Sequence, residues 1–491
     1  MPKRTSAAHL AALAVDPKSP EPLYRQIYFA IREAILDGRL APGQRLPATR
    51  TLARDLGLSR NTVVTAFEQL HAEGYVEGRT GAGSYVSTIL PEELLNARAA
   101  AGRTSGGRRR RRGPSERGAY LAGIRTRQES RPRAFSPGLP ELARFPFEDW
   151  ARLIARRWRR PSMSFLVAAD PAGYRPLREA IAQYLGAARA VSCTPDQVVV
   201  VSGAQQALDL MARVLIDPGD TVWMEEPGYP GMRGALLAAG ASLAPVPIDD
   251  EGLSVAAGRK LAPAARLACV SPSHQYPLGV TMSLTRRLEL LEWAREADAF
   301  ILEDDYDSEY RYGGRPLAAL QGLDEEGRVI YVGSLSKVMF PGLRIGYMIV
   351  PEDLVDAFIR VRVLVDTHPS SIAQAALADF IAEGYLAAHI RRMRALYAER
   401  QRMLLDVMAA GPDLALAPDE AGMHLVARLA KGIDDRVLSA RARAEGVEAP
   451  ALSTYYHGPP DRQGLLLGYA GLGETEIRDG VERLARALAS T

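Results

Sequence analysis

The stretch Ser334-Leu335-Ser336-Lys337-Val338-Met339-Phe340-Pro341-Gly342-Leu343-Arg344-Ile345-Gly346 decides how the larger part of this 491-residue chain is interpreted. A β-type run over residues 328–332 leads into it, and a second one over residues 347–350 follows it. The lysine therefore lies in a connection after a strand, with two serines just before it and an arginine seven residues later. We expect this connection to present an amine, two hydroxyls and a guanidinium on one side of a sheet.

These four groups suit one kind of ligand. A lysine amine can condense with an aldehyde, and hydroxyls with a guanidinium suit a phosphate. Pyridoxal 5'-phosphate (PLP) is an aldehyde that also carries a phosphate, so the stretch indicates a PLP site at Lys337. Most lysines in such turns are only solvated, and the stretch taken alone leaves both interpretations open.

The surrounding chain, residues 134–491, alternates strands and helices. The expected strands cover residues 198–201, 221–224, 267–270 and 300–303, and the first is followed by an expected helix over residues 204–215. This order predicts an α/β domain with a mostly parallel sheet covered by helices. In such sheets ligands bind beyond the carboxyl ends of the strands, so the residues at those ends are the candidate ligand contacts.

Two of these strand ends carry candidate ligand contacts. Ala204 and Gln205 open a helix directly after a strand, where free N–H groups attract phosphate; an ordinary helix start is the alternative. Tyr229 follows the next strand and could stack on a planar ring; a tyrosine packed on its own turn is the alternative.

The acidic run Glu303-Asp304-Asp305-Tyr306-Asp307-Ser308-Glu309 ends another strand. A buried carboxylate here could pair with a protonated pyridine nitrogen, and a phenol two residues later could reach the ring oxygen O3′. A metal-binding cluster or a solvated loop are the alternatives. No histidine is close in the sequence and Lys337 favours PLP, so we predict no metal.

Together these residues resemble the fold-type I aminotransferases, which also share the pattern Asp170-Pro171-x-Gly173-x-x-x-Leu177-Arg178. The resemblance implies that Lys337 condenses with PLP, Asp304 faces the pyridine nitrogen, Tyr306 holds O3′ and Tyr229 stacks on the ring. It also implies a phosphate site made of Ala204, Gln205, Ser334, Ser336 and Arg344.

The chain departs from the aminotransferases at two places. Their Asn-Pro-x-Gly loop is replaced by Tyr276-Pro277-Leu278-Gly279, so the asparagine donor to O3′ is missing. Leu466 stands where the carboxylate-binding arginine is expected, and a leucine cannot bind a carboxylate. We therefore expect any transaminase activity to be weak. Residues that could replace this arginine are Arg233, Tyr455, Tyr456 and His457.

Residues 20–88 have the pattern of a different domain. Three helical segments, with a tight turn between the second and third, precede two short β-type runs with a glycine-rich tip, residues 78–83. This order predicts a winged helix-turn-helix whose third helix, after Ser59, enters the major groove of DNA. A small helical domain that binds no nucleic acid is the alternative.

The same residues resemble the GntR family of bacterial regulators, through Pro22-Leu23-Tyr24, Leu46-Pro47 and Ser59-Arg60-Asn61-Thr62-Val63. By position, the resemblance implies DNA contacts from the second helix, the third helix and the tip of the wing. The residues are Arg50, Ser59, Arg60, Asn61, Thr62, Arg79 and Gly81.

The two parts of the chain carry net charges of opposite sign. The net charge of +3 is the sum of about +11 over residues 1–133 and about −8 over residues 134–491. A basic first part suits a polyanion. Residues 89–133 include the run Arg108 to Arg112 and have the composition of a flexible, largely disordered linker. We favour a spacer that adds salt-sensitive DNA affinity over a solvated spacer alone.

The cysteines and the absence of a long apolar run bear on where in the cell the protein is found. Cys193 and Cys269 form no CxxC motif, which fits a reducing cytoplasm, and no apolar run is long enough to span a membrane. We expect a cytoplasmic protein with no membrane association.

A GntR-like first domain joined to an aminotransferase-like second domain resembles the MocR subfamily of regulators. The resemblance implies a PLP-dependent transcriptional regulator that binds a double-stranded DNA operator. Its effector would be an amino compound or PLP itself, and the chain would form a head-to-tail homodimer. The alternative is an active aminotransferase that carries a DNA-binding domain.

Overall fold

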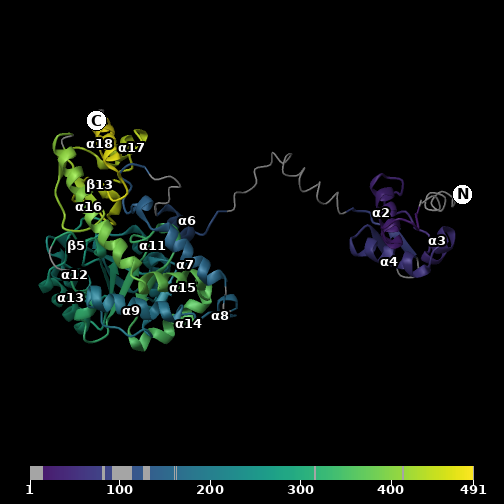
Figure 1. Ribbon diagram of the computed structural model, residues 1–491, viewed down its shortest axis with the longest axis horizontal. Helices are drawn as coiled ribbons and strands as arrows, with labels where there is room; N and C mark the ends of the chain where they lie inside the picture. Colours follow the sequence, from purple (N-terminus) through teal and green to yellow (C-terminus); the bar gives the residue numbers. More distant parts are fainter. Residues whose placement is uncertain are drawn as a thin grey trace. The chain divides into compact units, whose positions relative to one another are not determined.

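The computed structural model describes residues 15–79, 83–90, 113–124, 133–159, 161, 163–167, 169–313, 317–411 and 414–489. The chain divides into two compact units, Met1–Gly113 and Pro114–Thr491, which are drawn in Figure 1. Each unit has its own hydrophobic core, so each is described by itself.

The first unit is a winged helix-turn-helix. Its elements are α2 (Leu23–Leu36), α3 (Thr49–Leu56), α4 (Arg60–Ala72), β1 (Val76–Arg79) and β2 (Gly83–Val86). The two strands form an antiparallel hairpin in which Val76 faces Val86. This order confirms the predicted architecture.

Helical spacing explains the core of this unit. Ile27 and Ile31 on α2 pack with Val63 and Leu70 on α4, and all four side chains are completely buried. Residues three or four apart share one helix face, so each helix buries one apolar stripe. The opposite face of α4 remains available to solvent.

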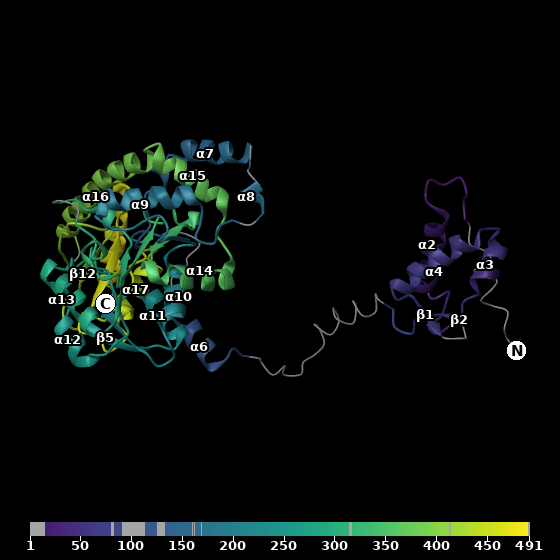
Figure 2. The same ribbon diagram turned by 90° about the horizontal axis from the view of Figure 1, so that it is seen from below.

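The second unit, drawn from a second side in Figure 2, is built on an eight-stranded sheet. The strand order is β3-β10-β9-β8-β7-β4-β5-β6. The pairs from β9 to β5 are parallel, and β10 and β6 pair antiparallel with their neighbours. The strands are β3 (Val198–Val201), β4 (Thr221–Glu226), β5 (Ser242–Asp249), β6 (Gly252–Leu253), β7 (Leu267–Val270), β8 (Phe300–Asp305), β9 (Val329–Ser334) and β10 (Gly346–Ile349).

Alternate residues of each strand face different helices because side chains in a strand point to opposite faces. Val199 and Val201 of β3 pack in the cluster that holds α10 (Ala204–Leu215) and α11 (Pro230–Ala239). Val198 and Val200 pack with α9 (Arg175–Arg189) and α15 (Ser371–Ala382). The sheet is therefore covered on both faces, as the α/β prediction requires.

The end of the chain forms a smaller three-stranded antiparallel sheet, β11 (Ala415–Leu416), β12 (His424–Arg428) and β13 (Gly464–Gly468). The helices α16 (Tyr385–Ala409), α17 (Asp435–Ala444) and α18 (Glu474–Ala489) accompany it. Their apolar residues belong to the same cluster as α9 and α15, so the smaller sheet and the larger one share a core.

Residues 113–124, which the structure describes within the predicted linker, include a helix. Residues Glu116–Gly123 form the helix α6, which packs against α11, and Arg117 donates a 3.4 Å hydrogen bond to the carbonyl of Leu237. The expectation that residues 89–133 are largely without structure is therefore wrong for this segment. The run Arg108 to Arg112 lies outside the described residues.

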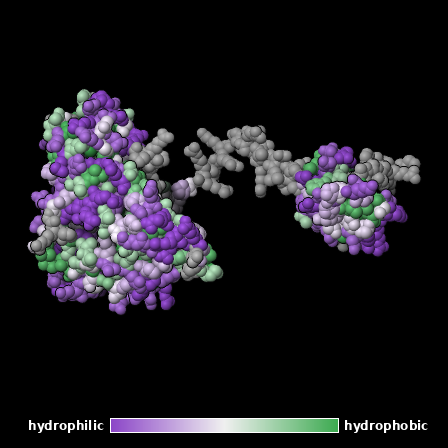
Figure 3. Space-filling model, viewed as in Figure 1, coloured by the Kyte–Doolittle hydropathy of each residue, from purple (hydrophilic) through white to green (hydrophobic). Residues whose placement is uncertain are grey.

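Two surface properties complete the fold. On the face drawn in Figure 3, hydrophilic residues predominate on each unit, with smaller hydrophobic areas between them. Among the described residues, no helix combines the length and the apolar character needed to cross a membrane.

Candidate functional site

Lys337 lies in the turn that follows β9, in partly buried surroundings. Its Nζ donates a 3.0 Å hydrogen bond to the carbonyl oxygen of Gly138, and the phenol of Tyr310 donates to the carbonyl of Lys337 itself, at 3.1 Å. Burial lowers the pKa of the Lys337 amine, and the charges of Asp307 and Asp304 partly oppose that shift. A lowered pKa favours the neutral amine, which is the nucleophilic form.

Asp304 stands at the end of the neighbouring strand β8 and is almost completely buried. Its Oδ1 has no hydrogen-bond partner among the described residues. The adjacent Asp305 instead accepts from Arg189 at 3.0 Å and from Tyr331 at 2.6 Å. Burial, then Asp305 and Asp307, raise the pKa of Asp304 to about 7. A buried carboxylate oxygen without a partner is costly and suits a cationic ligand atom.

Gly203, at the start of α10, lies against Arg344. Gly203 has φ +100°, and a Cβ built on it would lie 3.2 Å from Nη2 of Arg344. Arg344 is exposed, and no carboxylate pairs with it among the described residues. A guanidinium beside the first N–H groups of a helix makes an anion site.

The other predicted phosphate contacts differ in what they offer. The Ser334 hydroxyl accepts from the N–H of Ser336 at 3.3 Å, so both serines lie in one turn beside Lys337. The side-chain amide of Gln205 is directed to the carbonyl of Gly231, at 2.9 Å. Ala204 and Gln205 can therefore contribute mainly through the backbone at the helix start.

Four tyrosine rings lie close together, and two of them, Tyr229 and Tyr306, interact with the charge of Asp304. Tyr276 is their centre: its ring centroid lies 5.9 Å from Tyr229, 5.7 Å from Tyr306 and 5.4 Å from Tyr455, each at a steep interplanar angle. Tyr229 is the exposed member. The structure thus brings Tyr229 and Tyr306 to the same side chain, Tyr276. Tyr276 belongs to the loop Tyr276-Pro277-Leu278-Gly279, which replaces the Asn-Pro-x-Gly loop of the aminotransferases.

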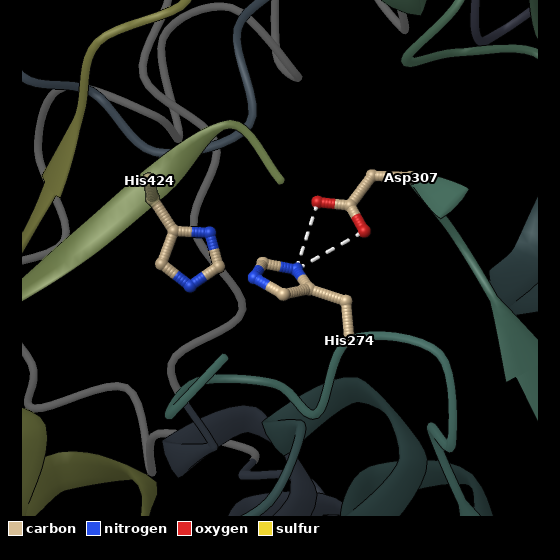
Figure 4. A group of neighbouring side chains, drawn as sticks. All are labelled: His274, Asp307 and His424. Atoms are coloured by element: carbon tan, nitrogen blue, oxygen red, sulfur yellow. Dashed lines mark hydrogen bonds and ion pairs between the residues drawn. The ribbon is translucent and has the colours of Figure 1, made fainter. Parts of the chain in front are cut away.

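The acidic run has a histidine partner that sequence reasoning missed. His274 is buried, and its Nδ1 lies 3.1 and 3.2 Å from the two oxygens of Asp307 (Figure 4). Its Nε2 lies 3.3 Å from Asp419 Oδ2, and Tyr306 Oη lies 2.9 Å from Nδ1. Because 33 residues separate His274 from Asp307 in the chain, spacing within the acidic run could not reveal this contact.

Leu466 is completely buried on β13, in a cluster with Leu452, Tyr455 and Tyr456. Among the proposed replacements for an arginine at this position, Arg233 donates a 2.9 Å hydrogen bond to the carbonyl of Tyr456. Its guanidinium makes no ion pair with a carboxylate among the described residues. Arg233 is thus the member of this group whose guanidinium lies beside the Tyr456 backbone.

The first unit presents its predicted DNA contacts on α3, α4 and β1. Arg50, Arg60 and Asn61 are exposed. The Ser59 hydroxyl caps α4 by accepting from the N–H of Thr62 at 3.1 Å. The Arg79 guanidinium lies over the ring of Tyr85, 4.5 Å from its centroid. Gly81 lies outside the described residues.

The fold and these sites define a winged helix-turn-helix unit followed by an aminotransferase-type unit. Residues 23–86 match the model of the bacterial regulatory proteins of the gntR family. Residues 139–484 match that of the aminotransferases of class I and II. A solved relative of the second unit is kynurenine aminotransferase of Pyrococcus horikoshii in complex with PMP, at 30% identity and TM-score 0.68, covering 77% of this chain and 95% of that one.

Full-length relatives show how the two units are combined. The probable rhizopine catabolism regulatory protein MocR of Rhizobium meliloti is 46% identical over 97% of this chain and 95% of its own length. The pyridoxine biosynthesis regulator PdxR of Corynebacterium glutamicum is 31% identical over 95% and 96%. The chain belongs to this MocR-type family of HTH transcriptional regulators.

Proposed function

We propose that this regulator binds PLP at Lys337 and that occupancy of this site changes its affinity for operator DNA. The observation that carries the proposal is the buried, unpartnered Oδ1 of Asp304, one strand away from a lysine whose amine is partly buried. A pyridinium nitrogen would satisfy that oxygen and keep Asp304 ionised.

The roles of the other residues follow from their chemistry. Arg344, the Ser334 and Ser336 turn and the first N–H groups of α10, at Ala204 and Gln205, would hold the phosphate. Tyr229 would cover the ring, and Tyr306 would donate to its phenolic oxygen. When bound, PLP supplies an aldehyde that reacts with amines.

Two effectors fit this site: an amino compound, or PLP itself. The pyridoxine-related name of one relative favours PLP as a signal. The buried Leu466 argues against efficient transamination, because it leaves no guanidinium at the place where aminotransferases hold the substrate carboxylate. We therefore expect sensing to dominate over turnover, with Arg233 a candidate cation for an acidic effector.

The first unit would bind double-stranded DNA in the cytoplasm. Arg60, Asn61 and Thr62 would enter the major groove, Arg50 would contact the backbone, and Arg79 with Gly81 would reach the adjacent minor groove. A head-to-tail homodimer would present two such units to paired half-sites. Regulation then requires that ligand binding favour one arrangement of the units over another.

One set of measurements tests the proposal. Purified protein titrated with PLP should develop a visible absorbance band that Lys337→Ala removes. Operator affinity or DNA bending should differ between the cofactor-free and PLP-loaded protein, and the difference should vanish in Lys337→Ala. Identical operator binding in both states of the parent chain would contradict cofactor sensing.

A further inference from the structure

His274 is surrounded by carboxylates on both sides of its ring. Nδ1 faces both oxygens of Asp307, at 3.1 and 3.2 Å, and Nε2 faces Asp419 at 3.3 Å. Ionised carboxylates only accept hydrogen bonds. Both ring nitrogens must therefore carry protons for these contacts to be favourable, which makes the ring a cation.

The protonation of Nδ1 fixes the hydrogen bond to Tyr306. The Tyr306 hydroxyl lies 2.9 Å from Nδ1. A protonated Nδ1 carries a single hydrogen and cannot accept, so the Tyr306 oxygen can only share, as an acceptor, the proton that Nδ1 also directs to Asp307. The phenol keeps its own proton, and the described residues offer no second acceptor for it. That proton remains available for a ligand.

The position of the imidazole is tightly enclosed. Gly422, with φ +90°, lies so close that a Cβ there would overlap the Cε1 of His274, and a Cβ on Gly279 would lie 3.2 Å from Nε2. The next residue of the loop, Gln275, donates from Nε2 to Glu225 at 3.1 Å and to the carbonyl of Pro227 at 2.9 Å. The ring therefore has little freedom to turn away from Tyr306.

We propose that His274 is a positively charged positioning residue that directs the Tyr306 proton toward the phenolic oxygen of a ring bound at Lys337. The proposal rests on the proposed PLP site. It assigns to His274 the ordering of Tyr306, which is the proposed O3′ donor in a chain that lacks the asparagine donor of the aminotransferases. His274 itself needs no contact with the ligand.

The groups around His274 agree with this assignment. Asp307 and Asp419 raise its pKa to about 10 against the opposing effect of burial. His424, whose ring centroid lies 5.3 Å away, has a pKa lowered to about 4 by burial and by the His274 charge. Tyr306 completes the surroundings, with its pKa raised well above the ordinary value by burial and Asp307.

A metal ion is the competing explanation of this cluster. His274, Asp307 and His424 offer ligand atoms that lie within 4.8 Å of one another (Figure 4). A histidine binds a metal through an unprotonated nitrogen, whereas both nitrogens of His274 face carboxylates and are needed as donors. A hydrogen-bonded cation accounts for the geometry without an ion.

The test follows the colour of PLP-loaded protein with pH. The midpoint of the visible band reports loss of the proton from the Lys337 nitrogen. Donation by Tyr306 to the ring oxygen, and the nearby positive charge, both lower this midpoint. We expect His274→Gln to raise it by about one pH unit, a tenfold change in proton affinity. Tyr306→Phe should raise it similarly.

A double variant separates positioning from an independent charge effect. If His274 acts through Tyr306, the shift in His274→Gln/Tyr306→Phe should be clearly smaller than the sum of the two single shifts. Thr281→Val, which removes a 3.3 Å hydrogen bond to the Ser273 carbonyl, controls for loosening of the same loop and should leave the midpoint in place. His274→Asn is measured in the same way if the glutamine variant is insoluble.

The outcomes distinguish the two proposals. A visible band that disappears in Lys337→Ala, together with an unchanged midpoint in both His274 variants, would overturn the positioning role and leave the PLP site standing. Additive shifts in the double variant, or a stoichiometric metal ion in the purified parent protein, would also overturn it. Absence of the band from the parent chain would reject both proposals.

Discussion

The amine of Lys337 donates a 3.0 Å hydrogen bond to the carbonyl oxygen of Gly138, 199 residues earlier in the chain. Gly138 has φ +71°, and a Cβ placed on it would overlap Nζ of Lys337. The start of the second unit thus forms one wall of the lysine site, and only a residue without a side chain allows the amine this close approach.

Gly138→Ala should therefore impair ligand binding at Lys337. The methyl group would displace the amine, and we expect the apparent PLP affinity, measured by absorbance titration, to fall at least about tenfold, which is about 1.4 kcal/mol. Gly384→Ala is the matched control, because Gly384 has φ +80° but no atom within 4 Å of its Cβ position. Equal affinities for the two variants would contradict the role of Gly138 as a wall.

Arg344→Gln tests the phosphate site. Removing the guanidinium beside Gly203 should weaken binding of PLP by about 1.5–3 kcal/mol, the usual contribution of a charged hydrogen bond. Binding of pyridoxal, which lacks the phosphate, should change much less. Dissociation constants of both compounds for both proteins provide the measurement, and a similar loss for the two ligands would place the phosphate elsewhere.

Asp304→Asn should stabilise the cofactor-free protein at high pH. The folded-state pKa of Asp304 is raised to about 7, so its destabilising charge appears as the pH rises from about 4 to about 7 and persists above that. We expect a gain in the free energy of unfolding of about 1–3 kcal/mol at pH 8.5 and a smaller one at pH 5.5, measured by denaturant titration.

The same Asp304 variant should bind PLP more weakly, because it loses the partner of the pyridine nitrogen. Asp250→Asn, at an exposed turn position, serves as the control for both measurements. A destabilised cofactor-free Asp304→Asn protein at pH 8.5 would show that the carboxylate has a favourable structural contact instead.

Leu466→Arg should not restore a substrate-binding arginine. Leu466 is fully buried among Tyr455, Tyr456 and Leu452, so the variant places an unpaired charge in an apolar cluster. We expect a loss of about 3–5 kcal/mol in the free energy of unfolding, against less than about 1.5 kcal/mol for Leu466→Met. A stable Leu466→Arg protein with increased transaminase turnover would contradict this expectation.

Arg60→Ala should weaken operator binding through the first turn of α4. If Arg60 contacts a phosphate, the slope of log affinity against log salt should become shallower by about 1. Arg25→Ala on α2, where Arg25 pairs with Glu21 at 3.2 Å, is the control and should leave both affinity and slope unchanged. Fluorescence anisotropy over a series of salt concentrations measures both quantities.

Local patterns were sufficient for the architecture. The apolar spacing of Ile27, Ile31, Val63 and Leu70 predicted the helices of the first unit, and the four valines of β3 predicted a buried strand. Strand and helix periods depend on neighbouring residues, so they can be seen in the sequence. The ordered helix α6 was missed because the arginine-rich composition around it indicated disorder, whereas its contact with α11 is tertiary.

The sequence by itself determined the family and the two domains and predicted Lys337 as the cofactor-binding lysine, because motifs and periodicities are local properties of the chain. Only the tertiary structure decided which of the adjacent acids has a charged partner: Oδ2 of Asp305 pairs with Arg189, 116 residues away, whereas Asp304 has a buried Oδ1 without a partner and forms no ion pair among the described residues. It also decided that His274 lies between Asp307 and Asp419. Such contacts depend on how distant strand ends meet at one edge of a sheet, and no spacing along the chain encodes them.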